Sequence, residues 1–286
     1  MLSHYMADHD THLTEHIEQA RTGLAAYMGN VQIPADVRTE ETELGGIPTL
    51  EVTIDGVEPE GTALWIHGGG YVAGSPRMML APAAAIARAG RLRVLSVDYR
   101  LAPEHPFPAA TDDLLTAYRA LLETTPNNRV VVGGESAGGG LAVWLVAAIR
   151  DAGLPLPRSV MVFSPAADLT VSGGTIRTKA HLDPILRPAS LVIDFGVYGS
   201  DRLAEADPLS VELRGLPPLF IEVGTHEILL DDALRLAARA AEADVEVSLE
   251  VAAGKTHGFP VGDPTAEGAD RALARVGAFI SSQLEV

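Results

Sequence analysis

The chain has 286 residues, of which 47% are hydrophobic, no cysteine, and a formal net charge of −17. A chain of this size and hydrophobicity can bury one large core, so we expect a single domain. The lack of thiols excludes disulfides, thiolate metal sites and a cysteine nucleophile. We interpret the negative charge as a solvated acidic surface. It argues against a nucleic-acid partner, whose phosphates would be repelled.

The N-terminal segment predicts an amphipathic helix over residues 12–28, where Leu13, Ile17, Leu24 and Met28 recur at helical spacing. The first ten residues have neither the basic flank nor the apolar centre of a signal peptide. No uncharged apolar run in the chain reaches the length of a membrane span. We therefore expect a cytoplasmic protein without a membrane partner.

Three histidines of this segment, His9, His12 and His16, could share one helix face. A metal site is one interpretation of this pattern. We favour a solvated face with incidental histidines, because the spacing supplies no carboxylate or fourth ligand.

Buried strands and helices alternate from about residue 41 onwards. Strands are expected at residues 49–54, 62–66, 93–98, 130–132, 159–163, 219–223 and 245–251. Helices are expected at residues 78–89, 109–124, 141–149, 232–243 and 264–283. This rhythm predicts an α/β fold in which a mostly parallel sheet is covered by helices on both faces.

Residues 168–210 interrupt the rhythm with Gly173-Gly174 and with prolines at 184, 188 and 208. We expect an insertion that folds over the carboxyl edge of the sheet together with the N-terminal helix. The expected organisation is an N-terminal helical cap segment at 1–40, the first part of the core at 41–167, the cap insertion at 168–210, and the second part of the core at 211–286.

One stretch predicts a strand, a sharp turn and a helix in direct succession. Val130, Val131 and Val132 run into a Gly-x-Ser-x-Gly pattern centred on Ser136, and an apolar helical pattern follows. A serine at such an elbow is held in a strained conformation, and glycines flank it at 134 and 138 because side chains there would collide. Alone, this pattern arises by chance in roughly one such chain in eight.

A serine hydroxyl needs a base to become a nucleophile. The candidate is His257, in a glycine-containing loop after the strand expected at 245–251, with His226 and His105 as rivals. The order serine, acid, histidine along the chain is that of one class of serine hydrolases.

The acid that orients this base is expected in the loop after residues 219–223. We prefer Glu227 to Asp231, because Asp231 and Asp232 are suited to open the next helix, where carboxylates complement the helix dipole.

A tetrahedral intermediate also needs backbone donors for its negative oxygen. The stretch His67-Gly68-Gly69-Gly70 after a strand suits this task, because successive glycines let N–H groups approach an oxyanion closely. The N–H group of Ala137, the residue after the candidate nucleophile, is a further candidate donor.

Together these residues resemble the hormone-sensitive-lipase-like branch of the α/β hydrolases, also called bacterial family IV esterases. The resemblance extends from about residue 40 to the end of the chain. It rests on four stretches: His67 to Gly70, Asp98 to Ala109, Gly134 to Gly139, and His257-Gly258-Phe259.

The resemblance implies the α/β-hydrolase fold with a helical cap, a triad of Ser136, Glu227 and His257, and oxyanion donors at Gly69, Gly70 and Ala137. It implies no cofactor and no metal. Two features depart from the usual pattern of the family: Glu135 stands where an aspartate is frequent, and Glu227-Ile228-Leu229 replaces Asp-Pro-Leu.

Two other classes of protein compete with this interpretation. A dinucleotide-binding loop over residues 68–73 is disfavoured, because Asp98 lies 30 positions after Gly68 where about 20 is expected. A ligand-binding protein that has lost catalysis is disfavoured, because every candidate triad residue is present.

The sequence therefore predicts a serine carboxylesterase for small esters with short acyl chains, acting through an acyl-enzyme. Hydrolysis of amides, lactones or carbamates by the same triad stays open. Four apolar or aromatic residues are candidates for the substrate pocket, although a place in the core of the cap explains them equally well: Tyr71, Leu191, Phe195 and Tyr198. A homodimer through the edge strand of the sheet is plausible, since family members often pair in that way.

Overall fold

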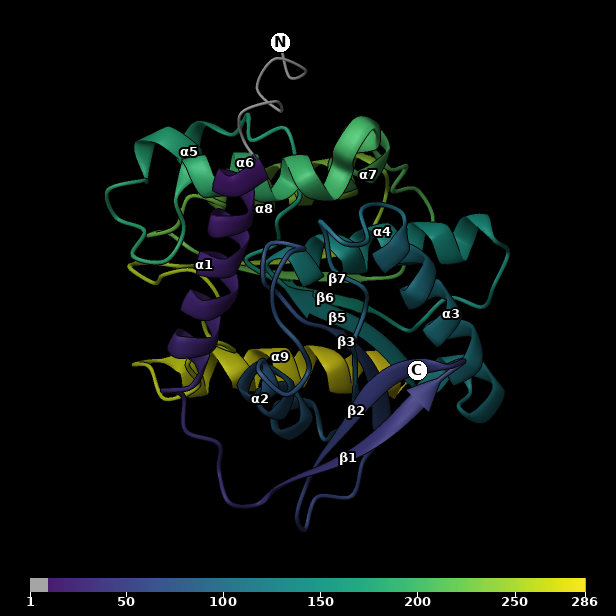
Figure 1. Cartoon of the computed structure of the whole chain (residues 1–286). Helices are drawn as coiled ribbons and strands as arrows, with labels where there is room; N and C mark the ends of the chain where they lie inside the picture. The colour runs from purple at the N-terminus through teal and green to yellow at the C-terminus, as the bar shows by residue number, and fades with distance from the viewer. Residues whose placement is uncertain (1–9, 286) are drawn as a thin grey trace.

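A computed structural model describes residues 10–285, and in them eight strands form one sheet (Figure 1). The strand order is β1-β2-β4-β3-β5-β6-β7-β8. The pairs β1–β2 and β2–β4 are antiparallel, and all other neighbours are parallel. The strands are β1 (Val37–Leu44), β2 (Ile47–Ile54), β3 (Gly61–Ile66), β4 (Leu92–Val97), β5 (Val130–Glu135), β6 (Val160–Phe163), β7 (Leu219–Gly224) and β8 (Val247–Ala252).

Helices cover both faces of this sheet, which confirms the expected fold class (Figure 1). Helices α2 and α9 pack on one face, and α3, α4 and α8 pack on the other. The helices are α1 (Asp10–Met28), α2 (Leu80–Gly90), α3 (Ala109–Thr124), α4 (Ala137–Asp151), α5 (Gly174–Thr178), α6 (Pro188–Gly199), α7 (Leu203–Ala206), α8 (Leu230–Glu242) and α9 (Ala269–Leu284), with short 3-10 turns at Asn127–Arg129, Ser200–Arg202 and Pro208–Ser210.

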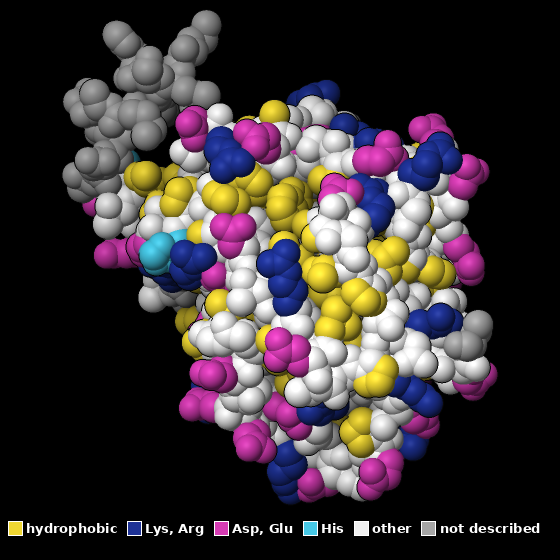
Figure 2. Space-filling model, turned by 90° about the vertical axis from the view of Figure 1, so that its right-hand side faces the viewer, with side chains coloured by type: hydrophobic (Ala, Val, Ile, Leu, Met, Phe, Trp, Pro, Cys, Tyr) yellow, Lys and Arg dark blue, Asp and Glu magenta, His cyan; other side chains and the backbone are white. Residues whose placement is uncertain are grey.

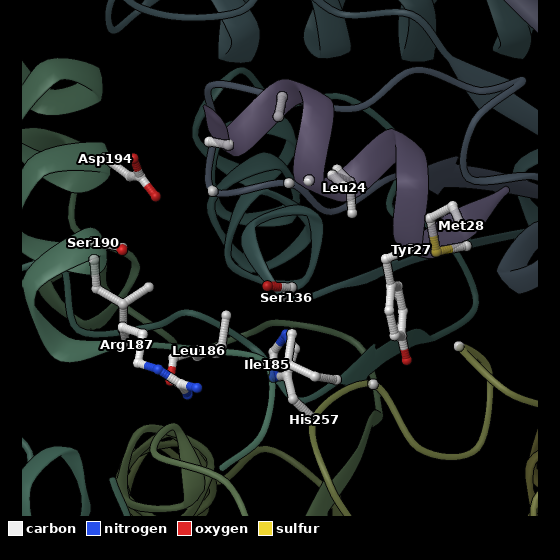
Figure 3. Close-up of a pocket in the computed structure, with 18 of the residues that line it drawn as sticks. Leu24, Tyr27, Met28, Ser136, Ile185, Leu186, Arg187, Ser190, Asp194 and His257 are labelled. Carbon is white, nitrogen blue, oxygen red and sulfur yellow. The ribbon is translucent and has the colours of Figure 1, made fainter. Parts of the chain in front are cut away.

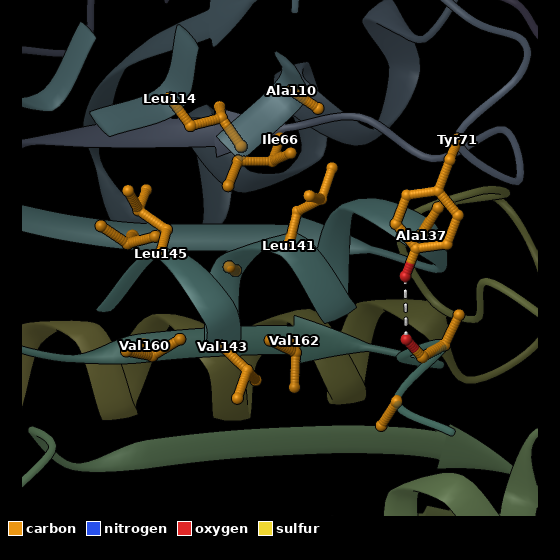
Figure 4. Packing of buried hydrophobic residues seen from close by; sticks show 14 of the residues in the cluster. Ile66, Tyr71, Ala110, Leu114, Ala137, Leu141, Val143, Leu145, Val160 and Val162 are labelled. Carbon is orange, nitrogen blue, oxygen red and sulfur yellow. Dashed lines mark hydrogen bonds between the residues drawn. The ribbon is translucent and has the colours of Figure 1, made fainter. Parts of the chain in front are cut away.

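The central strands read as continuous apolar runs because both of their faces are buried. On one face, Ile66 of β3 and Val162 of β6 belong to the same cluster as Leu141 and Leu145 of α4 (Figure 4). The neighbouring residues in these strands point the other way, so that Trp65 packs in the second cluster with α2 and α9. The two clusters pack against opposite faces of the sheet and fix the positions of β3, β5 and β6.

Strand β1 is the element that the sequence pattern did not identify. Its residues Val37–Leu44 are mostly polar and exposed, so no buried face marks them. The strand is held by antiparallel pairing with β2, in which Val37 lies opposite Ile54 and Leu44 opposite Ile47. Backbone pairing at an edge leaves little trace in the sequence.

Helices α5, α6 and α7, from the insertion, lie together at one end of the molecule, and α1 stands beside them (Figure 1). None of the described helices is both long and apolar enough to cross a bilayer. The face shown in Figure 2 mixes acidic and basic side chains rather than separating them. The cytoplasmic location expected from the sequence stays a prediction.

Candidate active site

The turn between β5 and α4 holds Ser136 in a strained backbone conformation, with φ +54° and ψ −123°. Its N–H donates to the carbonyl of Phe163 on the neighbouring strand at 2.8 Å. A Cβ atom on Gly134 would lie 2.3 Å from the carbonyl oxygen of Gly138, and one on Gly138 would lie 2.1 Å from that of Ile66. The predicted strain and the predicted need for both glycines are confirmed.

A histidine and a carboxylate meet in the loops that follow β7 and β8. Nδ1 of His257 lies 2.9 Å from Oε2 of Glu227, whose side chain is fully buried. Because a carboxylate only accepts hydrogen bonds, Nδ1 is the donor in this contact, and in the neutral imidazole Nε2 then keeps its lone pair. The other oxygen of Glu227 accepts from the N–H of Gly224 at 2.6 Å and from Oγ of Ser164 at 2.9 Å.

The rival acid Asp231 lies elsewhere. Its carboxylate accepts from the N–H of Gly174 at 2.9 Å. Its neighbour Asp232 accepts from the N–H of Asp168 at 2.9 Å. Both aspartates lie in the first turn of α8, as expected, but their carboxylates bind the insertion instead of capping their own helix. The structure therefore brings Glu227, and not Asp231, to the imidazole.

Charges around the imidazole shift its protonation. Burial lowers the pKa of His257, but the hydrogen bond and charge of Glu227, with the charges of Glu135 and Asp183, outweigh it and leave the pKa raised above the ordinary 6.5. Burial also raises the pKa of Glu135, against the opposing effects of His257 and the backbone of Gly68. Glu135 thus lies beside the imidazole as a second, more distant carboxyl group.

The glycine loop after β3 presents backbone N–H groups. Gly69 has φ +120° and Gly70 has φ +64°. A Cβ atom on Gly69 would lie 2.1 Å from the carbonyl oxygen of Ala73, so the loop needs glycine there. Within residues 10–285, the N–H groups of Gly69, Gly70 and Ala137 donate to no other group. Ala137 is the first residue of α4, where the helix dipole favours a negative ligand.

Gly69, Gly70, Ser136 and His257 line one cavity of about 620 Å³. Its floor, here called the pocket floor, consists of Gly69, Gly70, Ser136 and His257. Its other wall, here called the pocket roof, consists of α1, α6 and the segment 184–187 that leads into α6. Figure 3 shows Ser136 between side chains of α1 and side chains of α6. Residues of both helices therefore line the cavity that holds the serine.

The pocket roof is tied together by an ion pair. Nε2 of His16 on α1 lies 2.7 Å from Oδ1 of Asp194 on α6, and the two side chains are 19% and 11% exposed. Burial raises the pKa of Asp194, and His16 opposes this shift. Helix α1 is also bound by Arg21, which donates to the carbonyl of Val72 at 2.8 Å and pairs with Glu104.

The interpretation of the N-terminal histidines as incidental was therefore wrong for His16. Its partner lies 178 residues further along the chain, beyond the reach of a local pattern. His12 is exposed, 3.8 Å from Glu15, and His9 lies outside the described residues. In the described part of the chain, no group of three or more histidine, aspartate or glutamate residues could hold a metal ion.

Of the four residues expected at the substrate, the structure places Leu191 and Phe195 in the cavity wall. Tyr71 and Tyr198 are not in this wall: they are buried, with stacked rings whose centroids lie 4.1 Å apart. The hydroxyl of Tyr71 donates to the carbonyl of Ala166 at 3.1 Å (Figure 4). These two tyrosines therefore belong to the core beneath the insertion, which was the alternative to a place in the substrate pocket.

The rival histidines do not reach the cavity. His105 is exposed on the proline-rich loop, and neither it nor His226 lines the pocket.

Two buried polar residues that the sequence did not single out support the acid and the base. Oγ of Ser164 accepts from the N–H of Gly258 at 3.0 Å and donates to Glu227, so it joins the acid loop to the histidine loop. Asp183 accepts from the N–H of Ile228 at 2.9 Å. Ser164 directly follows the strand expected at 159–163, and this position at the end of a strand is one that could have marked it as a site residue.

Comparisons with known proteins were consistent with this geometry. A family model described as the alpha/beta hydrolase fold matches residues 63–261. An acetyl-hydrolase of Streptomyces hygroscopicus is 40% identical over 223 residues, which cover 77% of this chain and 75% of the relative. A carboxylesterase of Mycobacterium tuberculosis, NlhH, is 30% identical over 85% of this chain and 82% of its own.

Solved structures of hydrolases of the same fold are also similar to this chain. A hormone-sensitive lipase from a metagenome library superposes with a TM-score of 0.88 at 34% identity, covering 93% of this chain and 92% of the other. An esterase from the bacterial hormone-sensitive lipase family superposes with a TM-score of 0.87 at 35% identity, covering 95% and 98%.

Proposed function

The chain belongs to the α/β hydrolases, in their hormone-sensitive-lipase-like branch, and is an ester hydrolase, in which we propose that Ser136 is the nucleophile, His257 its base and Glu227 the acid that orients the base. The observation that carries this proposal is the 2.9 Å contact between His257 and Glu227 in a cavity that also exposes the strained Ser136.

In the first half of the reaction, Oγ of Ser136 attacks the acyl carbon of the ester while Nε2 of His257 takes the hydroxyl proton. The negative oxygen of the tetrahedral intermediate accepts hydrogen bonds from the N–H groups of Gly69, Gly70 and Ala137. Collapse of this intermediate breaks the bond to the alcohol oxygen, which receives the proton from His257. An acyl-enzyme ester on Ser136 remains.

In the second half, His257 removes a proton from a water molecule that attacks the acyl-enzyme. A second tetrahedral intermediate forms at the same N–H groups and collapses as Ser136 recovers its proton from the imidazolium. The fully buried carboxylate of Glu227 stabilises this imidazolium in both halves, and Ser164 and Gly224 hold the carboxylate in place. The products are the free alcohol and the carboxylic acid.

The preferred substrates on this proposal are small carboxylic esters with short acyl chains. A cavity of about 620 Å³ beneath two helices supports this choice, because a long chain would need an exit past the pocket roof. We propose that residues 1–40 and 168–210 act together as a cap, since α1 and α6 both line the cavity. Pairing of two copies through the edge strand and a cytoplasmic location stay predictions.

The test combines Ser136→Ala with a matched serine substitution, Ser282→Ala, at an exposed position on α9. Hydrolysis of p-nitrophenyl acetate, butyrate, octanoate and palmitate is measured. We expect Ser136→Ala to lower kcat by about 10⁴-fold or more, Ser282→Ala to behave as wild type, and the wild type to prefer acetate and butyrate. A fluorophosphonate should label the wild-type protein on the peptide that contains Ser136.

A Ser136→Ala protein that unfolds at the wild-type temperature and keeps more than a tenth of the activity would refute the nucleophile assignment. A wild-type preference for palmitate would refute the choice of short acyl chains alone.

A further inference from the structure

Both sides of the pocket roof combine apolar and polar side chains. On the side of α1, the cavity is lined by Leu24, Tyr27 and Met28 together with His16 and Gln19. Arg187 and Ser190 lie at the start of α6 (Figure 3). Ser190, Leu191 and Asp194 share one face of α6 by their spacing, and Arg187 directly precedes the helix. The α6 side is not polar throughout, because Leu191 and Phe195 also line the cavity, but it carries the guanidinium of Arg187.

The guanidinium of Arg187 is held by neutral groups only. Nη1 donates to the carbonyl oxygens of Asp183 at 2.8 Å and of Leu186 at 3.0 Å. The carboxylate of Asp183 is already occupied by the N–H groups of Ile185, Leu186 and Ile228, each at 2.9 Å. Among residues 10–285, Nε and Nη2 of Arg187 donate to no partner, and no carboxylate lies within ion-pair distance.

The remaining charged groups of the cavity are matched. Asp194 is paired with His16 at 2.7 Å. Glu135 is buried, and its charge acts on His257 and the backbone of Gly68. Arg187 is therefore the cavity cation that lacks an acidic partner in the described part of the chain. Arg187 is exposed and lines this cavity, so its free N–H groups are open to a ligand.

On the basis of the proposed function of Ser136, we propose that Arg187 binds a carboxylate carried by the substrate. The substrate class is then a small ester with a carboxylate on one side of the ester bond and an apolar group on the other. A guanidinium with a free Nε–Nη2 edge can bind a carboxylate through two parallel hydrogen bonds. The apolar group would lie against Leu24 and Met28 of α1.

Two matched substrate pairs test this proposal on either side of the ester bond. Hemisuccinate and 4-oxopentanoate esters of p-nitrophenol differ in the charge at the end of the acyl group. The acetyl esters of 4-hydroxybenzoate and 4-hydroxyacetophenone differ in the charge on the alcohol. The measured quantity is kcat/KM for the charged ester divided by that for its neutral partner.

The variants are Arg187→Gln, Arg187→Lys and the control Arg177→Gln, which removes an exposed positive charge from α5 outside the cavity. We expect Arg187→Gln to lower the ratio about fivefold or more in one of the two pairs, mainly through KM. Arg187→Lys should lose less, and Arg177→Gln should not change the ratio. The wild-type ratio should fall as salt is raised.

If Arg187→Gln leaves both ratios within twofold of the wild type, or lowers charged and neutral esters alike, Arg187 does not bind a substrate carboxylate. The neutral esters separate this result from a failure of the proposed function. Wild-type protein that does not hydrolyse them would contradict the role of Ser136, whereas normal hydrolysis without discrimination would contradict the role of Arg187 only.

Discussion

The pocket floor and the pocket roof are held in place by different forces. Ser136 in the floor, and Glu227, the buried partner of His257, are fixed by hydrogen bonds to the backbone of buried strands and loops. In the roof, α1 is tied to the rest of the molecule by packing and by a few ion pairs, one of which, Arg21 with Glu104, is exposed. On the proposed function, the reacting groups thus lie on the rigid core, and the residues expected to select the substrate lie on a more weakly held surface.

This difference predicts large losses of rate from changes in the floor and small changes in KM from changes in the roof. The following predictions are ordered by the size of the expected effect.

Glu227→Gln should have the largest effect of the three, lowering kcat/KM about 10³-fold or more, because an amide can neither stabilise the imidazolium nor fix its tautomer as a carboxylate does. Asp231→Asn is the matched control, since Asp231 contacts Gly174 instead of the imidazole. It should keep more than a tenth of the activity. Steady-state kinetics on p-nitrophenyl butyrate distinguish the two, and a greater loss in Asp231→Asn would reverse the assignment of the acid.

The pH dependence of the wild type should reflect the raised pKa of His257. The base must be neutral to take the serine proton, so kcat/KM should fall as the pH drops through a pKa above the ordinary 6.5. Below that pKa the rate should decrease about tenfold per pH unit. In Glu227→Gln the midpoint should move to lower pH, because Glu227 makes the largest contribution that raises the pKa.

A pH profile with an acid midpoint well below 6.5 in the wild type would contradict this electrostatic account of the floor. Thermal unfolding across the same pH range separates a loss of activity from a loss of structure.

Asp194→Asn should have the smallest effect. The substitution leaves His16 with a neutral partner and loosens the contact between α1 and α6, which is 2.7 Å long in the native protein. We expect KM for p-nitrophenyl butyrate to rise by about two- to fivefold, corresponding to the few tenths to one kcal/mol of a partly exposed ion pair. The value of kcat should stay within twofold of the wild type.

The control for this last prediction is Asp201→Asn, an exposed aspartate that follows α6 and lies outside the cavity. If Asp194→Asn instead lowers kcat by more than tenfold at unchanged KM, the separation between a catalytic floor and a selective roof is wrong.

The sequence by itself determined the α/β fold and the residues of the floor. Strands and helices that are buried in a two-sided sheet carry a strong local period, and the loops at the ends of parallel strands must meet at one edge. For the same reason the sequence predicts that Ser136, Glu227 and His257 share one site, although Ser164, at another strand end, is not among the predicted residues.

Only the tertiary structure decided the composition of the roof. His16 and Asp194 are 178 residues apart, and their contact depends on how α1 and α6 pack over the core. The same packing turns Tyr71 and Tyr198 into the core and leaves Leu191 and Arg187 in the cavity wall. Helical periodicity predicts which side chains share a face. The element against which that face packs depends on long-range contacts, which no local pattern encodes.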